Sequence, residues 1–165
     1  MQSLLESFYE GAMINIYSRK LVKSYLTFLE KPTSENECRV AAFLASFMEA
    51  LNKGEPRKLI KFFTPEARID SLTAKRSVNP QAYMQIVKRA SDAEAVEAAF
   101  LDNVQFYSGS FTNSETMELF GVLSIINRGG GAQSRECRIG LQYDSSNILQ
   151  ISEIKYPHGN RTKHK

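Results

Sequence analysis

The spacing of apolar residues changes once along this chain, at Ala95, and that change constrains the fold more than any other feature. Before Ala95, apolar residues recur at helical spacing, and after it they alternate with polar residues. The alternating part predicts four strands with short Gly-, Ser- and Asn-rich turns between them: Val96–Tyr107, Glu115–Asn127, Ser134–Asp144 and Ile148–Tyr156. Helices followed by hairpin-linked strands indicate an α+β domain, with helices on one face of a curved antiparallel sheet.

Three helices are predicted ahead of these strands, and each has a start signal. Ser34 and Glu37 match a capping box, in which a serine oxygen accepts from a free helix N–H and a glutamate reaches back. Gly54 suits the left-handed residue that ends a helix, and Pro56 suits the first turn of the next. The pair Asn79–Pro80 begins the third helix in the same way.

The chain divides into three parts. We expect residues 1–33 to form an N-terminal helical extension, residues 34–157 to form the main domain, and residues 158–165 to form a flexible basic tail. The extension is predicted because residues 3–30 carry apolar side chains at helical spacing. The tail accounts for the whole net charge of +3, through Arg161, Lys163 and Lys165.

Composition narrows the setting in which the protein works. No apolar run is long enough to span a bilayer, and the N-terminus lacks the basic and apolar regions of a secretory signal. Cys38 and Cys137 share no metal or redox spacing, and both lie among apolar neighbours. We therefore expect buried, reduced thiols and a cytoplasmic protein.

Charge is unevenly distributed within the main domain. Residues 53–89 contain nine basic and three acidic residues, whereas residues 91–118 contain six acidic residues and no Lys or Arg. A nucleic-acid surface would be one interpretation of the basic stretch, but such stretches are usually solvated faces or complements of an acidic surface. Nucleic acid is not among the partners that we expect.

The predicted strand over residues 115–127 is apolar on both faces. One face carries Leu119, Leu123 and Ile125, and the other carries Phe120, Val122 and Ile126. The helices can cover only one face, so the other needs a second cover. We favour a homodimer, with Phe120, Val122, Ile126 and Arg138 at its interface, over an N-terminal segment that folds back across the same face.

From about residue 38 to about residue 157, the order of these elements resembles that of the NTF2-like (SnoaL-like) superfamily. The most specific part of the resemblance is the short helix that ends in Phe62-Phe-Thr-Pro-Glu-Ala-Arg-Ile-Asp70. The family implies a cone-shaped domain, dimeric through its outer sheet face, with a pocket between helices and sheet. Its members include isomerases, cyclases, dehydratases, transport factors and assembly domains, so the fold does not choose a function.

On this resemblance, the pocket would be lined by apolar and aromatic residues of the predicted helices and strands. They are Phe47, Leu51, Phe63, Ile69, Tyr83, Val87, Phe100, Val104, Cys137, Ile139 and Leu141. The only histidines, His158 and His164, lie in the tail. The main domain therefore has no imidazole base, which excludes the family's His-dependent dehydratases and most kinds of zinc site. We expect no metal and no cofactor.

Carboxylates are the remaining candidates for catalysis. Asp70 lies near the position of the isomerase base, but alternation places it on the face opposite Ile69. Asp102 shares a predicted face with Phe100 and Val104, where an apolar environment would raise its pKa. Tyr143 could present a hydroxyl to the same cavity, although a structural role is the simpler interpretation.

We favour a non-catalytic homodimeric domain that binds a small apolar ligand or a protein partner. The alternative is a small SnoaL-like enzyme that transfers a proton at a carbonyl, with Asp102 or Asp70 as base and Tyr143 as hydrogen-bond donor.

Overall fold

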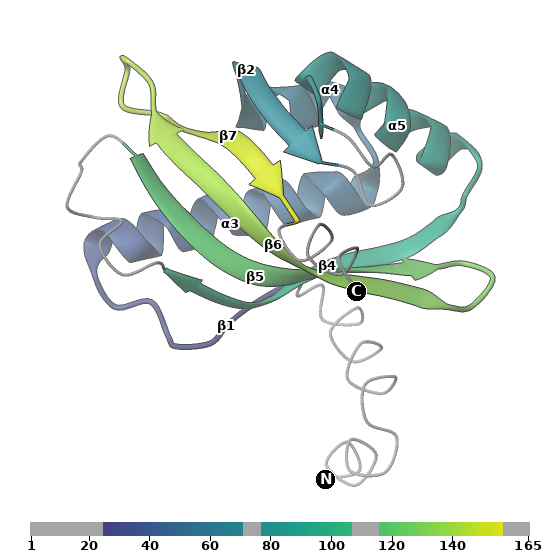
Figure 1. The fold of residues 1–165 in the computed structure, drawn as a ribbon, viewed down its shortest axis with the longest axis horizontal. Coiled ribbons are helices and arrows are strands. Elements are labelled where there is room, and N and C mark those ends of the chain that lie inside the picture. The colour runs from purple at the N-terminus through teal and green to yellow at the C-terminus, as the bar shows by residue number, and fades with distance from the viewer. Residues whose placement is uncertain (1–24, 71–76, 107–115, 157–165) are drawn as a thin grey trace, which may run out of the picture.

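The computed structural model describes residues 25–70, 77–106 and 116–156, and Figure 1 shows their arrangement. Most of the predicted N-terminal helical extension and all of the basic tail lie outside these residues. One part of the extension prediction is wrong, because Leu26–Phe28 forms a strand, β1. This segment pairs with the edge of the sheet through bonds such as Leu101 N–H to Tyr25 O, at 2.9 Å, and that pairing overrides its helical spacing.

The helices begin and end where the capping residues predict. Ser34 caps α3 (Glu35–Lys53), and its hydroxyl accepts from the Glu37 N–H at 3.0 Å. Gly54 ends α3 with φ at 65°, and a side chain there would also collide with Ser91. The remaining helical elements are α4 (Pro56–Leu59), the 3₁₀ turn η1 (Ile60–Phe62) and α5 (Pro80–Asp92). None of the described helices is long and apolar enough to cross a membrane.

The described strands form one sheet on which the helices pack from one side (Figure 1). Besides β1 they are β2 (Phe63–Asp70), β3 (Ser77–Val78), β4 (Val96–Phe106), β5 (Thr116–Asn127), β6 (Ala132–Tyr143) and β7 (Leu149–Lys155), in the order β1-β4-β5-β6-β7-β2-β3. The sheet is mixed and not antiparallel throughout: β1 runs parallel to β4, and β2 runs parallel to β7. Both strands precede the hairpin-linked meander and join its two outer strands, so no short turn forces them to be antiparallel.

Strand β5 has the two apolar faces that its sequence predicts. Leu119 is buried in the hydrophobic core, and Leu123 and Ile125 are partly buried and pack against it from the same face. Phe120, Val122 and Ile126 alternate with them and therefore lie on the outer face, where each is only half-buried. The core lies between the helices and one face of the sheet.

Bulges reverse the alternation in the neighbouring strands; besides the two described next, Glu97 is an extra residue near the start of β4, between Val96 opposite Asn127 and Ala98 opposite Ile126. In β4, Asp102 is opposite Val122 and Gln105 is opposite Phe120, so β4 has one extra residue, and Asn103 has φ at 56°. In β7, Ile151 is opposite Leu141 and Glu153 is opposite Gly140, so Ser152 is the extra residue. Beyond each bulge, the side chains that face the core follow the opposite parity.

The bulge in β4 corrects two sequence predictions. Phe100 and Asp102 precede it and pair with Ser124 and Val122 on the outer face, whereas Val104 follows it and lies in the core. Phe100 is fully buried there, with the Tyr25 ring 5.7 Å away. Simple alternation places all three on one face, because nothing in the local residue pattern marks an extra residue.

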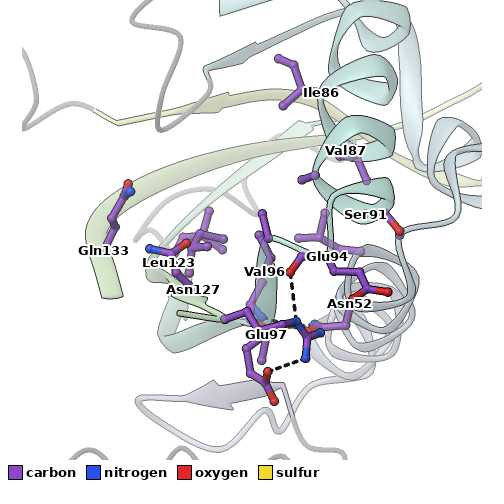
Figure 2. Close-up of a pocket in the computed structure, with 18 of the residues that line it drawn as sticks. Asn52, Ile86, Val87, Ser91, Glu94, Val96, Glu97, Leu123, Asn127 and Gln133 are labelled. Atoms are coloured by element: carbon purple, nitrogen blue, oxygen red, sulfur yellow. Dashed lines mark hydrogen bonds and ion pairs between the residues drawn. The ribbon is translucent and has the colours of Figure 1, made fainter. Parts of the chain in front are cut away.

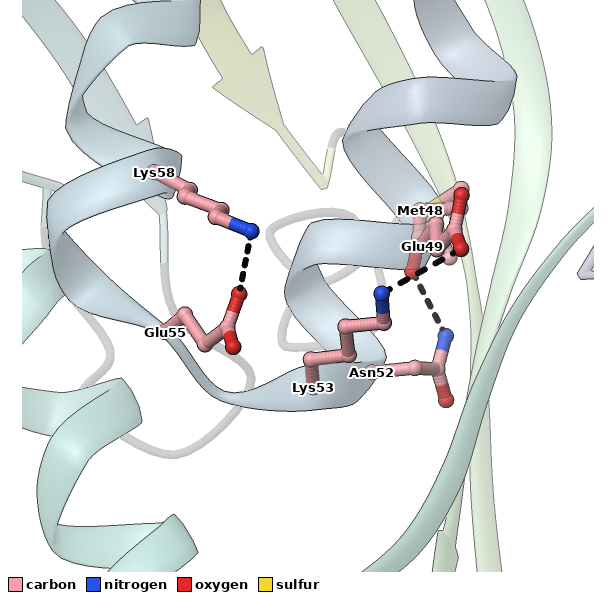
Figure 3. A network of polar contacts seen from close by, with 6 residues as sticks. All are labelled: Met48, Glu49, Asn52, Lys53, Glu55 and Lys58. Atoms are coloured by element: carbon pink, nitrogen blue, oxygen red, sulfur yellow. Dashed lines mark hydrogen bonds and ion pairs between the residues drawn. The ribbon is translucent and has the colours of Figure 1, made fainter.

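The side chain of Asn52 joins α3 to the sheet. Its amide donates to Ala99 O at 2.9 Å and accepts from Ala99 N at 2.8 Å, as a neighbouring strand would do. It also donates to Met48 O within α3, beside the surface ion pairs Lys53–Glu49 and Lys58–Glu55 (Figure 3). One amide thereby satisfies two backbone groups at the edge of β4, just before the point where its pairing with β1 begins.

We predict that Asn52→Ala lowers the free energy of unfolding by about 2 kcal/mol, because it leaves the Ala99 N–H and C=O without partners. Urea denaturation followed by circular dichroism measures this. The matched control is Asn127→Ala, whose side chain makes no hydrogen bond among the described residues; we expect a change below about 0.5 kcal/mol. Equal effects of the two substitutions would contradict the role given to Asn52.

Candidate functional site

A cavity of about 440 Å³ lies between α5, the end of α3 and the sheet. Figure 2 shows α5 contributing Ile86, Val87 and Ser91 on one side, with the strands opposite. Its inner wall is apolar and aromatic: Leu51, Tyr83, Val87, Leu123, Ile125 and Tyr156. A cavity of this size and character suits a small organic molecule.

The cavity contains three of the pocket residues predicted from the sequence, namely Leu51, Tyr83 and Val87. Seven others are buried in the core and do not line the cavity: Phe47, Phe63, Ile69, Val104, Cys137, Ile139 and Leu141. Phe100 is on the outer face of the sheet, as described above. Prediction from apolar spacing identified the core layer as a whole, and the open space occupies one end of that layer.

The charged residues of the cavity lie at its rim and are engaged with one another. Arg128 donates through Nε to the backbone O of Glu94 at 3.0 Å, and its guanidinium is 3.1 Å from the Glu97 carboxylate (Figure 2). Asn127 and Gln133 add neutral amides to the same rim. The rim therefore presents no uncommitted cation to an anionic ligand, as far as the described residues show.

Three protonated groups lie together at the inner end. Burial raises the pKa of Tyr83 to about 12, with a smaller contribution from Cys137. Burial also raises the pKa of the Cys137 thiol to about 12. The pKa of Tyr156 rises further still, first through burial and then through Tyr83, Cys137 and Asp70. All three groups therefore keep their protons at neutral pH.

The three residues considered for catalysis lie in three different places. Asp70 accepts from Ser77 Oγ at 2.6 Å and from Tyr156 N at 3.3 Å, on the side opposite the buried Ile69. Asp102 accepts from Thr27 Oγ1 at 3.0 Å on the outer face. Tyr143 donates to Asn36 Oδ1 at 2.6 Å, near the start of α3. None of them lines the cavity.

Sequence reasoning missed Tyr156 as a site residue. Alternation from Leu149 and Ile151 would place it on the outer face, and only the extra residue at Ser152 turns it inward. The ring of Tyr156 also lies beneath the Arg135 guanidinium, 5.0 Å from the ring centroid. The described residues contain no cluster of three His, Cys, Asp or Glu that could hold a metal.

A second, more open hollow of about 650 Å³ lies between α3, η1 and the β6–β7 turn. Its lining combines the half-buried pair Phe43 and Phe62, whose ring centroids are 5.4 Å apart, with the cations Arg39, Lys58 and Lys61. Arg39 is held in place, because it donates to Asn147 O at 3.2 Å and lies over the Tyr143 ring.

No protein-family model matches the sequence, and no curated protein sequence matches it. Solved structures do match. Aln2 from a Streptomyces species has a TM-score of 0.60 at 14% identity, over 81% of this chain and 99% of that one. A protein from Catenulispora acidiphila in complex with S-DNPA has a TM-score of 0.59 at 14% identity, over 76% of this chain and 95% of that one.

A third structure, whose name includes NTF2, has a TM-score of 0.57 at 13% identity, over 74% of this chain and 99% of that one. At these identities the likeness concerns the fold. The chain therefore has the NTF2-like fold, and the resemblance predicted from its sequence is confirmed at that level.

The two cysteines should differ sharply in reactivity. Cys38 is exposed, which corrects the expectation that both thiols are buried, whereas Cys137 is in the core. At about pH 8 we predict that 5,5′-dithiobis(2-nitrobenzoic acid) labels Cys38 rapidly and Cys137 only after unfolding, because burial suppresses its thiolate. Cys38→Ser should remove the fast phase and Cys137→Ser should leave it; a fast phase that survives Cys38→Ser would contradict this assignment.

Proposed function

We propose that this chain is a non-catalytic NTF2-like domain that binds a small apolar ligand and forms a homodimer through its outer sheet face. The observation that carries the ligand proposal is the cavity of about 440 Å³ beside α5. A protein of the same fold, from Catenulispora acidiphila, is in complex with S-DNPA, so this fold holds a ligand in at least one protein.

The lining of the cavity favours an apolar ligand. Leu51, Val87, Leu123 and Ile125 supply aliphatic surface, and burying a ligand against them gains about 25 cal/mol for each Å² removed from water. The charged rim residue Arg128 is already bonded to Glu94 and Glu97. The volume of the cavity, about 440 Å³, suits a small molecule better than a protein segment.

Binding without catalysis is favoured by the position of the carboxylates. Proton transfer at a carbonyl needs an acid or base within hydrogen-bond reach of the reacting atom. Asp70 and Asp102 lie outside the cavity, where they accept hydrogen bonds from Ser77 and Thr27. Neither carboxylate can therefore serve as the base that the alternative, a SnoaL-like enzyme, would need in the cavity. The acids that do line the cavity, Glu94 and Glu97, are at its rim.

The homodimer is proposed from the outer face of β4, β5 and β6. Phe120, Val122 and Ile126 form an apolar row there. Arg138, opposite Phe120 on β6, has a buried Nε without a hydrogen bond among the described residues. Buried donors are costly when unpaired, and an acceptor from a second copy would satisfy this one.

A cytoplasmic location is also proposed, since neither Cys38 nor Cys137 forms a disulfide.

Filling the cavity should abolish ligand binding. Nile red, a neutral dye whose emission shifts to the blue in apolar surroundings, should bind the wild-type protein. Ala90→Phe places a ring in the cavity and fills its apolar space. We therefore predict that the affinity for the dye, measured by fluorescence titration, falls about tenfold or more. The control is Ala45→Phe on the exposed face of α3, which should bind as wild type. Undiminished binding by the Ala90 variant would refute the cavity as the site.

The dimer predicts a separate response. We expect sedimentation velocity to show a dimer for the intact chain and a monomer for Phe120→Glu, because burying a carboxylate in an apolar interface costs more hydration than its pairing with Arg138 opposite would return. Ile148→Glu is the control, since Ile148 is 56% exposed on the β6–β7 turn. If the Phe120 variant sediments as wild type, the outer face is not the interface.

A further inference from the structure

Two tyrosines line the cavity, and packing fixes both of their rings. The Tyr83 ring packs against Phe63, with centroids 5.8 Å apart, and the Tyr156 ring lies beneath Arg135. The Tyr156 backbone is also held, because its N–H donates to Asp70. Neither tyrosine hydroxyl has a hydrogen-bond partner among the described residues, although both residues line the cavity. Packing alone would be satisfied equally well by phenylalanine.

The chemistry of these hydroxyls makes both of them donors. Burial keeps each phenol protonated, as its raised pKa indicates, and the neighbouring Cys137 thiol is protonated too. The nearest carboxylate, that of Asp70, already accepts from Ser77 and from the Tyr156 backbone. Two phenol donors without an acceptor need an acceptor from outside the chain, and water fills that role until a ligand displaces it.

A carbonyl oxygen matches this arrangement best. It has two lone pairs, so it can accept from both phenols at once, and it brings no charge into an apolar site. A carboxylate would need a cation, but the cation of the lining, Arg128, is bonded to Glu94 and Glu97 at the rim. Ligand groups that only donate would leave the two phenols unpaired.

We infer that the cavity selects an uncharged, mainly apolar molecule whose carbonyl oxygen accepts hydrogen bonds from the hydroxyls of Tyr83 and Tyr156. This inference rests on the proposed ligand-binding function and adds the chemical class of the ligand. The apolar walls hold the hydrocarbon part, and the two phenols distinguish a ketone, ester or lactone from a hydrocarbon of the same shape.

The test compares two probes of nearly equal shape, 2-acetylnaphthalene and 2-isopropylnaphthalene, by displacement of Nile red. Wild-type protein should bind the ketone about tenfold more tightly than the hydrocarbon, as expected for two net hydrogen bonds. Tyr83→Phe and Tyr156→Phe should each reduce this preference about threefold, and the double variant should remove it. Tyr25→Phe, on the outer face beside Phe100, should leave the preference unchanged.

Affinity for the hydrocarbon shows whether each variant retains a folded cavity, since it should match wild type in every Tyr→Phe variant. No preference for the ketone in wild-type protein, or a full preference in the double variant, would overturn the inference while leaving the apolar cavity intact. Loss of hydrocarbon binding in the single variants would also overturn it, because the tyrosines would then support the cavity instead of binding the carbonyl. Failure of wild-type protein to bind Nile red or either probe would refute the proposed function itself.

Discussion

Bulges in the middle of β4 and of β7 decide which side chains meet inside this domain. A strand alternates its side chains between faces, so a single inserted residue exchanges the faces for everything beyond it. The bulge near Asn103 sends Asp102 outward and Val104 into the core. The bulge at Ser152 turns Tyr156 inward, where its ring meets the cavity. The cavity therefore receives a phenol from β7, and the Asp102 carboxylate lies on the other face of the sheet.

The cavity also depends on how α3 is attached to the sheet. Asn52 bonds both backbone groups of Ala99, which fixes the last turn of α3 against β4. The next residues make the left-handed turn at Gly54, whose bare Cα lies against Ser91 near the end of α5. The positions of α3 and α5 are thereby linked at the edge of the cavity. With both helices fixed in this way, the cavity between them and the paired ends of β4 and β5 stays open, although apolar side chains line it on both sides.

How far the sequence predicts this structure follows from the range of the forces involved. Caps at Ser34 and Gly54 were predictable because the residues that make them are neighbours in the chain. The faces of β5 were predictable because the strand has no interior bulge between Leu119 and Ile125. The strand at Leu26–Phe28 was not, since it exists only through pairing with β4. The bulges were not predictable either, because the residues at those positions, asparagine and serine, are also common in turns and loops.

The outer face of the sheet and the cavity can be occupied at the same time because they lie on opposite faces of the same strands. Within β5, Leu123 and Ile125 line the cavity while Val122 and Ile126 lie on the outer face. A second copy packed on the outer face would offer an acceptor to the buried Arg138 Nε, whereas the rim residues Asn127, Arg128 and Gln133 belong to the cavity. It would also stiffen β4 and β5 from behind, and a stiffer sheet holds the cavity wall in place for the ligand at lower entropic cost. The proposed dimer and the proposed ligand would thus be compatible, with the dimer supporting the site from the face that the ligand does not use.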